Sequence, residues 1–216
     1  MAVEADELLG ISPFETPDAR LVAELCAAGA VGVLDLGAGD RRARRALDQT
    51  TRWTSGPFGV RLGEDCDFPI DELPDAVQLI VVPAGRAVPA GRRTFVEVTD
   101  LDQARRAIAA GASGLIARGA EAGGRVGELT TFVLLQQLLA ELDVPIWACG
   151  GIGPHTAAAA MAGGAAGVVL DTQLALLPSA SPTREVVSAL AAMDGSETTV
   201  LDGRRVLQPR AGGPAL

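Results

Sequence analysis

The chain of 216 residues contains no lysine, tyrosine or asparagine, and its single histidine is His155. Without a lysine amine it cannot form a Schiff base or complete a Walker-type phosphate loop. One histidine excludes a histidine-rich metal site, and the cysteines lack zinc-ligand spacing, so we predict no metal. A Ser-His-Asp triad would depend on His155, and no nucleophile-elbow motif accompanies it. The protein therefore either takes its reactivity from a cofactor or has none.

Further absences concern location and partners. The net charge of −9 argues against nucleic acid as a partner. No unbroken run of about 18 apolar residues would span a membrane, and residues 1–10 lack the basic flank of a signal peptide. The three cysteines are scattered and odd in number, which suits a reducing compartment. We expect a cytoplasmic protein with no nucleic-acid or membrane partner.

Apolar residues make up 48% of the chain and gather in eight short runs separated by helical stretches. Most runs lack apolar/polar alternation, which is typical of parallel strands buried on both faces. The runs lie at residues 8–13, 31–36, 58–62, 77–82, 94–99, 113–118, 144–149 and 166–171. Eight units of fairly even spacing predict an α/β fold, a compact (β/α)8 barrel of the TIM type. An open doubly wound sheet gives similar local signals and is the alternative.

Two connections are too poor in helix formers for full crossover helices. Residues 63–76, after the third strand, allow about one helical turn. Residues 83–93, after the fourth strand, are short and rich in proline and glycine. We therefore expect reduced helices after strands three and four. Exposed apolar sheet at that thin wall would favour association, so we expect a homodimer.

The pattern of alternating apolar runs and helical stretches stops near the end of the chain. We assign residues 1–195 to the barrel domain and residues 196–216 to a C-terminal tail. Asp202 and Gly203 stand between two short β-like runs and predict a hairpin turn. The final residues 211–216, AGGPAL, read as a linker.

The loop after the sixth strand is a first candidate for a binding site, because barrel active sites lie beyond the carboxyl ends of the strands. Gly123 and Gly124 allow the backbone to approach a ligand closely. Glu121 and Arg125 flank them. The same residues are also compatible with a tight surface turn whose charges are solvated.

The loops after the seventh and eighth strands are the second candidate. Gly150 and Gly151 leave backbone N–H groups free just before a helix, which is a favourable place for a phosphate. A plain glycine turn is the alternative. Thr172 and Gln173 can add hydrogen bonds, whereas Asp171 beside them would repel a phosphate.

Glu97 is unusual because it lies inside the fifth strand. A carboxylate in such a place needs a partner, and an arginine in the barrel interior such as Arg61 is the clear candidate.

Several of these motifs resemble a known family. The segments GASGLIARGAEAGGRVG (111–127), TTFVLLQQLL (130–139) and VPIWACGGIGPHTAAAAMAGGAAGVVLDTQLAL (144–176) resemble the nitronate monooxygenases and the related flavin-dependent enoyl reductases. The resemblance is strong over residues 94–177 and weaker over residues 8–62. The version found here looks most like barrels at the N-terminus of large bacterial polyketide or polyunsaturated-fatty-acid synthases.

This resemblance implies a site for FMN. It implies that the phosphate rests on Gly150, Gly151, Thr172 and Gln173, and that the loop from Glu121 to Gly124 closes over the flavin. In the family a histidine base follows this loop, and here the position is Arg125. An arginine cannot accept a proton at neutral pH, but it can hold a carbonyl oxygen while hydride moves.

The resemblance leaves three readings open. The leading one is an FMN-dependent oxidoreductase in which Arg125 positions an acyl thioester, free or on an acyl carrier protein, with NADPH or NADH as reductant. The second is a barrel that has lost its flavin and serves as a structural or docking domain beside neighbouring synthase domains. The third is a nitronate monooxygenase that uses a different base.

Overall fold

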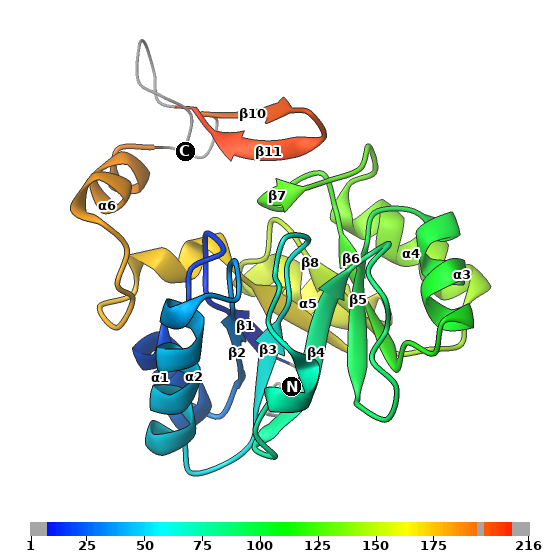
Figure 1. Cartoon of the computed structure of the whole chain (residues 1–216). Helices are drawn as coiled ribbons and strands as arrows, with labels where there is room; N and C mark the ends of the chain where they lie inside the picture. The colour runs from blue at the N-terminus through cyan, green and yellow to red at the C-terminus, as the bar shows by residue number, and fades with distance from the viewer. Residues whose placement is uncertain (1–7, 194–196, 209–216) are drawn as a thin grey trace.

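The computed structural model describes residues 8–193 and 197–208, and there the chain forms a closed barrel of parallel strands (Figure 1). Neighbouring strands follow the chain order, and β9 pairs with β1 to close the ring. This confirms the (β/α)8 barrel and excludes the open doubly wound sheet. The barrel strands are β1 (Leu8–Ile11), β2 (Val31–Asp35), β3 (Phe58–Arg61), β4 (Val77–Pro83), β5 (Thr94–Val98), β6 (Gly114–Arg118), β8 (Ile146–Cys149) and β9 (Gly167–Leu170).

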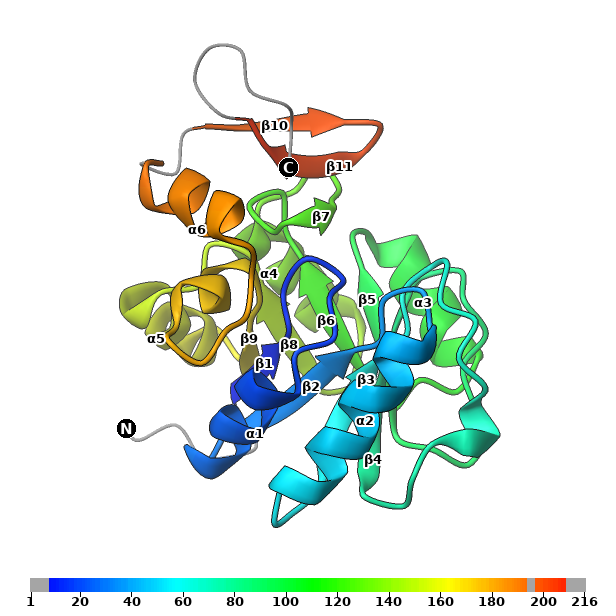
Figure 2. The same cartoon turned by 60° about the vertical axis from the view of Figure 1, so that its left-hand side comes forward.

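The described residues form six α-helices; the first five lie along the outside of the ring, and the last contacts the 3-10 segment after β9 (Figure 2). They are α1 (Ala19–Ala27), α2 (Arg41–Trp53), α3 (Leu101–Ala109), α4 (Thr131–Glu141), α5 (Pro154–Ala162) and α6 (Arg184–Ala191). Between β3 and β4 there is only a 3-10 turn, Ile70–Glu72, and the described connection from β4 to β5 contains no helix. The prediction of reduced helices after strands three and four is confirmed.

The apolar core has two layers, one between strands and helices and one inside the barrel. The inner layer comprises Leu9, Ile11, Val33, Leu79, Val81, Phe95, Ile116, Ala122, Trp147, Cys149 and Val169. Its largest members touch, since the ring centroids of Phe95 and Trp147 are 4.2 Å apart. Aromatic and aliphatic side chains thus form the interior of the barrel below its carboxyl end.

The alternation of side chains along each strand determines what lies above this inner layer. In a strand, residues i and i+2 face the same side. Five interior positions are therefore followed, two residues later, by a polar or charged one at the carboxyl end of the barrel. These residues are Asp35 after Val33, Arg61 after Gly59, Glu97 after Phe95, Arg118 after Ile116 and Asp171 after Val169.

A small antiparallel sheet lies over the carboxyl end of the barrel (Figures 1 and 2). It consists of β10 (Thr198–Leu201), β11 (Arg204–Leu207) and the short β7 (Gly124–Arg125). The turn from β10 to β11 is made by Asp202 and Gly203, with φ of 49° and 73°. The proposed linker, 211–216, lies outside the described residues, and the domain boundary at residue 195 stays a prediction. No helix within the described ranges is long and apolar enough to cross a membrane.

Gly119 offers a test of how closely β6 and α4 are joined. A Cβ atom added there would collide with the backbone nitrogen and the hydroxyl of Thr131, the first residue of α4. We expect Gly119→Ala to lower the free energy of unfolding by about 1–3 kcal/mol, because the backbone must move to admit the methyl group. Urea unfolding measures this change. Gly56→Ala is the control, since nothing lies within 4 Å of its added Cβ; equal losses in both variants would contradict the expectation.

Candidate active site at the barrel mouth

A pocket of about 470 Å³ opens at the carboxyl ends of the strands. Its floor is made by strand ends, one wall by the loop that carries Gly123 and Gly124, and its cover by the hairpin residues Arg204 to Leu207. Pockets of this size are typical of small-molecule sites, and the carboxyl end is where barrel enzymes place them. The pocket lies at the end of the barrel where we expect the site, and its role stays a prediction.

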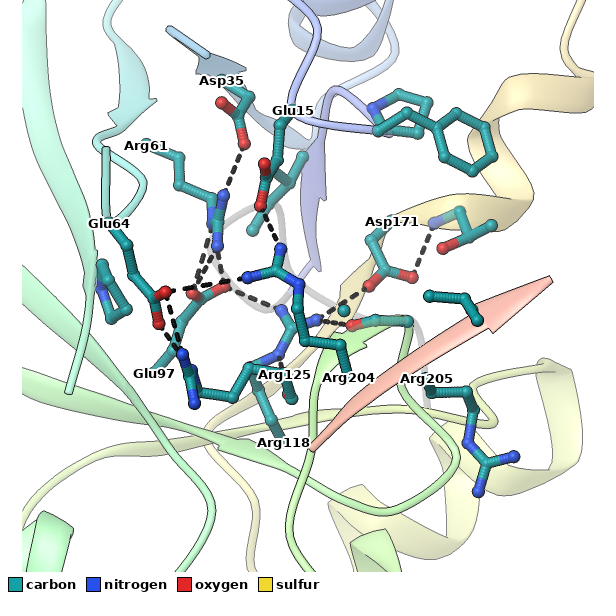
Figure 3. Close-up of a pocket in the computed structure, with 18 of the residues that line it drawn as sticks. Glu15, Asp35, Arg61, Glu64, Glu97, Arg118, Arg125, Asp171, Arg204 and Arg205 are labelled. Carbon is teal, nitrogen blue, oxygen red and sulfur yellow. Dashed lines mark hydrogen bonds and ion pairs between the residues drawn. The ribbon is translucent and has the colours of Figure 1, made fainter. Parts of the chain in front are cut away.

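A chain of buried and half-buried ion pairs crosses the floor of the pocket (Figure 3). The guanidinium of Arg61 lies 2.7 Å from Asp35 and 2.9 Å from Glu97. Arg118 lies 2.8 Å from the other oxygen of Glu97, and its Nη2 is 3.6 Å from Asp171. The predicted Glu97–Arg61 pair is confirmed, and Glu97 turns out to bridge two arginines.

Protonation states in this network follow from burial and pairing. Burial raises the pKa of Glu97, but Arg61 and Arg118 outweigh burial and hold that pKa at about 2. Burial also raises the pKa of Asp35, although Arg61 opposes the change. Burial and the charge of Asp171 raise the pKa of the Cys149 thiol, so this cysteine stays protonated and is not a nucleophile at neutral pH.

Arg125 lies at the outer edge of the pocket, on β7. Its side chain is 51% exposed and forms a bidentate pair with Glu64, with Nη2 2.9 Å from Oε2. The guanidinium of Arg125 holds the pKa of Glu64 below its usual range. The structure thus brings Arg125 to the pocket, but with a partner that sequence reasoning missed.

Arg118 fixes the loop after β6 over the floor. It donates hydrogen bonds to the backbone oxygens of Gly123 and Arg125. Gly124 has a φ of +72°, which favours glycine, and a Cβ added at Gly123 would lie 2.7 Å from the hydroxyl of Thr172. The glycines therefore let the loop after β6 touch the loop after β9.

The predicted phosphate-binding residues gather around a second pocket of about 320 Å³. It shares four residues with the first, Glu121, Gly123, Asp171 and Thr172, and it is also lined by Gly150, Gly151 and Gln173. Within the described part of the chain, the backbone N–H groups of Gly151 and Ile152 donate to no protein acceptor. Free donors are therefore present before α5, and the phosphate-binding role of Gly150, Gly151, Thr172 and Gln173 stays a prediction.

Comparisons with known proteins identify this barrel. A family model described as nitronate monooxygenase matches residues 86–208, which is more than half of the chain. The chain belongs to the nitronate monooxygenase family. The solved structure of FabK from Thermotoga maritima superposes on the barrel with a TM-score of 0.84, at 26% identity, over 94% of this chain and 71% of that one.

Two curated relatives carry the name (3aS,4S,5R,7aS)-5-hydroxy-7a-methyl-1-oxo-octahydro-1H-indene-4-carboxyl-CoA dehydrogenase. The protein from Rhodococcus jostii RHA1 is 29% identical over 84% of this chain, and that from Mycobacterium tuberculosis H37Rv is 32% identical over 88%. The matched regions span only 55% and 59% of these relatives.

Members of the nitronate monooxygenase family use FMN, and the two pockets fit this group unequally. The larger pocket, walled by the glycine loop, has a volume typical of small-molecule sites. The smaller pocket has free N–H groups, but its described lining includes two carboxylates, Glu121 and Asp171, and no arginine. Glu121 is held by Thr131, whose N–H and hydroxyl lie 2.9 and 3.0 Å from it. The smaller pocket, where the FMN phosphate would lie, therefore does not fit a group with two negative charges.

The bridging role of Glu97 is tested by Glu97→Gln. The amide leaves Arg61 and Arg118 buried with reduced compensation, so we expect a loss of about 3–5 kcal/mol in the free energy of unfolding. Urea unfolding at pH 7 gives the value. Glu72→Gln is the control, because Glu72 pairs with Arg44 on the surface, where screening weakens the pair. A Glu97→Gln protein as stable as Glu72→Gln would contradict the bridging role.

The pKa of Glu97 also predicts a pH dependence. Because this pKa is lower in the folded chain than its ordinary 4.5, the carboxylate stabilises the fold above pH 4.5, and this contribution is lost as the pH falls toward 2. Unfolding measured between pH 7 and pH 3 should show a steeper loss in the wild type than in Glu97→Gln, which lacks the titrating group. Parallel curves would exclude Glu97 as the source of the acid sensitivity.

Proposed function

We propose that this barrel is a flavin-dependent oxidoreductase that acts on acyl thioesters. The observation that carries the proposal is the 470 Å³ pocket at the carboxyl ends of the strands, floored by paired guanidinium groups and walled by the glycine loop. Family membership supports the flavin, which when bound would supply hydride transfer. The names of the two curated relatives, which both end in carboxyl-CoA dehydrogenase, support a thioester substrate.

The chain's own residues would bind the flavin and orient the substrate. Gly123 and Gly124 would present their backbone to the flavin ring, and Arg118 keeps their loop in place through the Gly123 oxygen. Arg125, once it exchanges Glu64 for the substrate, donates to the thioester carbonyl. An arginine in this position cannot take a proton from a nitroalkane, which favours thioester chemistry over nitronate oxidation.

The remaining partners belong to the same proposal. NADPH or NADH would reduce the flavin, and the thioester would be presented on coenzyme A or an acyl carrier protein beside neighbouring synthase domains. A homodimer would cover the thin wall at β3 to β5. All three cysteines are free thiols, which supports a cytoplasmic location.

A second candidate function rests on the smaller pocket, where the phosphate of FMN would lie. Two carboxylates line it, and Asp171 already accepts a hydrogen bond from the Thr172 N–H at 2.6 Å. This observation favours a barrel that has lost its flavin and serves as a structural or docking domain. A purified protein that stays colourless after incubation with FMN and riboflavin would select this candidate.

Arg125→Ala tests the proposed enzyme. With a crotonyl thioester as substrate, we expect the turnover of the flavin-loaded protein to fall about 100-fold, because one donor to the carbonyl oxygen is lost. Anaerobic oxidation of the reduced flavin measures the rate. Arg20→Ala is the control, since Arg20 lies on the surface of α1 and pairs with Glu24. Equal turnover in Arg125→Ala and wild type would remove Arg125 from the mechanism.

A further inference from the structure

The smaller pocket contains a negative charge that would repel the phosphate of FMN. Asp171 lies at the junction of both pockets, between the glycine loop after β6 and the Gly150–Gly151 turn after β8. Figure 3 shows its carboxylate at one end of the ion-pair network, facing Arg118. Any ligand that extends from the larger pocket into the smaller one passes this carboxylate.

The two oxygens of Asp171 have different surroundings. Oδ1 accepts the Thr172 N–H at 2.6 Å, so this donor is not available to a ligand. Oδ2 lies 3.6 Å from Arg118, which is nearer to Glu97 at 2.8 Å. Arg118 therefore shares its charge between two carboxylates and does not fully neutralise Asp171.

The charges of the whole floor lead to the same conclusion. The network contains three carboxylates, Asp35, Glu97 and Asp171, against two arginines, and is left with one negative charge. Around the larger pocket, Arg125 and Arg204 pair with Glu64 and Glu15. Arg205 also lines the larger pocket but not the smaller one, and its guanidinium donates to the Ala120 oxygen and the Thr198 hydroxyl. A phosphate monoester with nearly two negative charges at neutral pH would meet two carboxylates and no arginine in the described lining of the smaller pocket.

We propose that Asp171 makes this site discriminate against the phosphate of a flavin, so that the barrel binds riboflavin at least as tightly as FMN. The isoalloxazine ring and the ribityl hydroxyls are uncharged and meet the pocket equally in both ligands. The two differ only at the end that faces Asp171, where repulsion offsets the free N–H groups of Gly151 and Ile152. This inference rests on the proposed function, because it concerns the form of flavin that the same site takes.

The experiment compares the dissociation constants of FMN and riboflavin, measured by quenching of flavin fluorescence. For the wild type we expect an FMN-to-riboflavin ratio of one or more. Asp171→Asn removes the charge and keeps an oxygen near Thr172, so we expect the ratio to fall at least about tenfold. Asp171→Ser makes the same test with a smaller neutral side chain, in case the asparagine variant does not fold.

Asp35→Asn is the matched control. Asp35 ends the same ion-pair network on the opposite side, and it lines only the larger pocket. Its replacement alters the network and leaves the phosphate end unchanged, so the ratio should stay at the wild-type value. Salt provides a second readout, because screening weakens repulsion. Raising the salt concentration should tighten binding of FMN to the wild type and leave riboflavin unaffected.

The outcomes separate the two proposals. Tight FMN binding by the wild type with the same ratio in Asp171→Asn overturns the role of Asp171 and leaves the flavin enzyme standing. Failure of every variant to bind either flavin overturns the proposed function and this inference with it. Binding of FMN by Asp171→Asn alone supports the inference and identifies Asp171 as the residue that excludes the phosphate.

Discussion

The mouth of this barrel depends on one carboxylate held between two guanidinium groups. Glu97 accepts from Arg61 on one side and Arg118 on the other, and both arginines reach further, to Asp35 and Asp171. Four strands and the loop after β9 are thereby joined across the opening, where apolar side chains give way to solvent. Charges buried in this way cost desolvation energy that only close pairing offsets, so each member constrains the positions of the others.

The same network determines how the surrounding loops are shaped. Arg118 uses its remaining N–H groups for the backbone of the glycine loop, and Gly123 in turn rests on Thr172. The larger pocket thus has a rigid floor with a wall fixed to it. The smaller pocket is different, because its two carboxylates accept hydrogen bonds from the local backbone: Glu121 from the Thr131 N–H at the start of α4, and Asp171 from the Thr172 N–H.

Much of this arrangement could be predicted from the sequence. The remaining features could not, for physical reasons. The eight apolar runs predicted the barrel because both faces of each strand are buried, and the inward position of Glu97 predicted a partner such as Arg61. Asp35 and Arg118 were missed, although each ends an apolar strand two residues after an interior side chain, a signal that strand alternation provides. The pairing of Arg125 with Glu64, 61 residues away in the chain, depends on loop geometry that no local pattern encodes.

The strand pairing at the top of the molecule has a consequence for motion. Arg204 pairs with Arg125 across the β11–β7 ladder, and the Val126 N–H donates to the Gly203 oxygen at 3.0 Å. The hairpin that covers the pocket and the loop that carries Arg125 are therefore joined by main-chain hydrogen bonds. Raising the hairpin to exchange a ligand would withdraw this arginine at the same moment, so admission and positioning are coupled through main-chain hydrogen bonds.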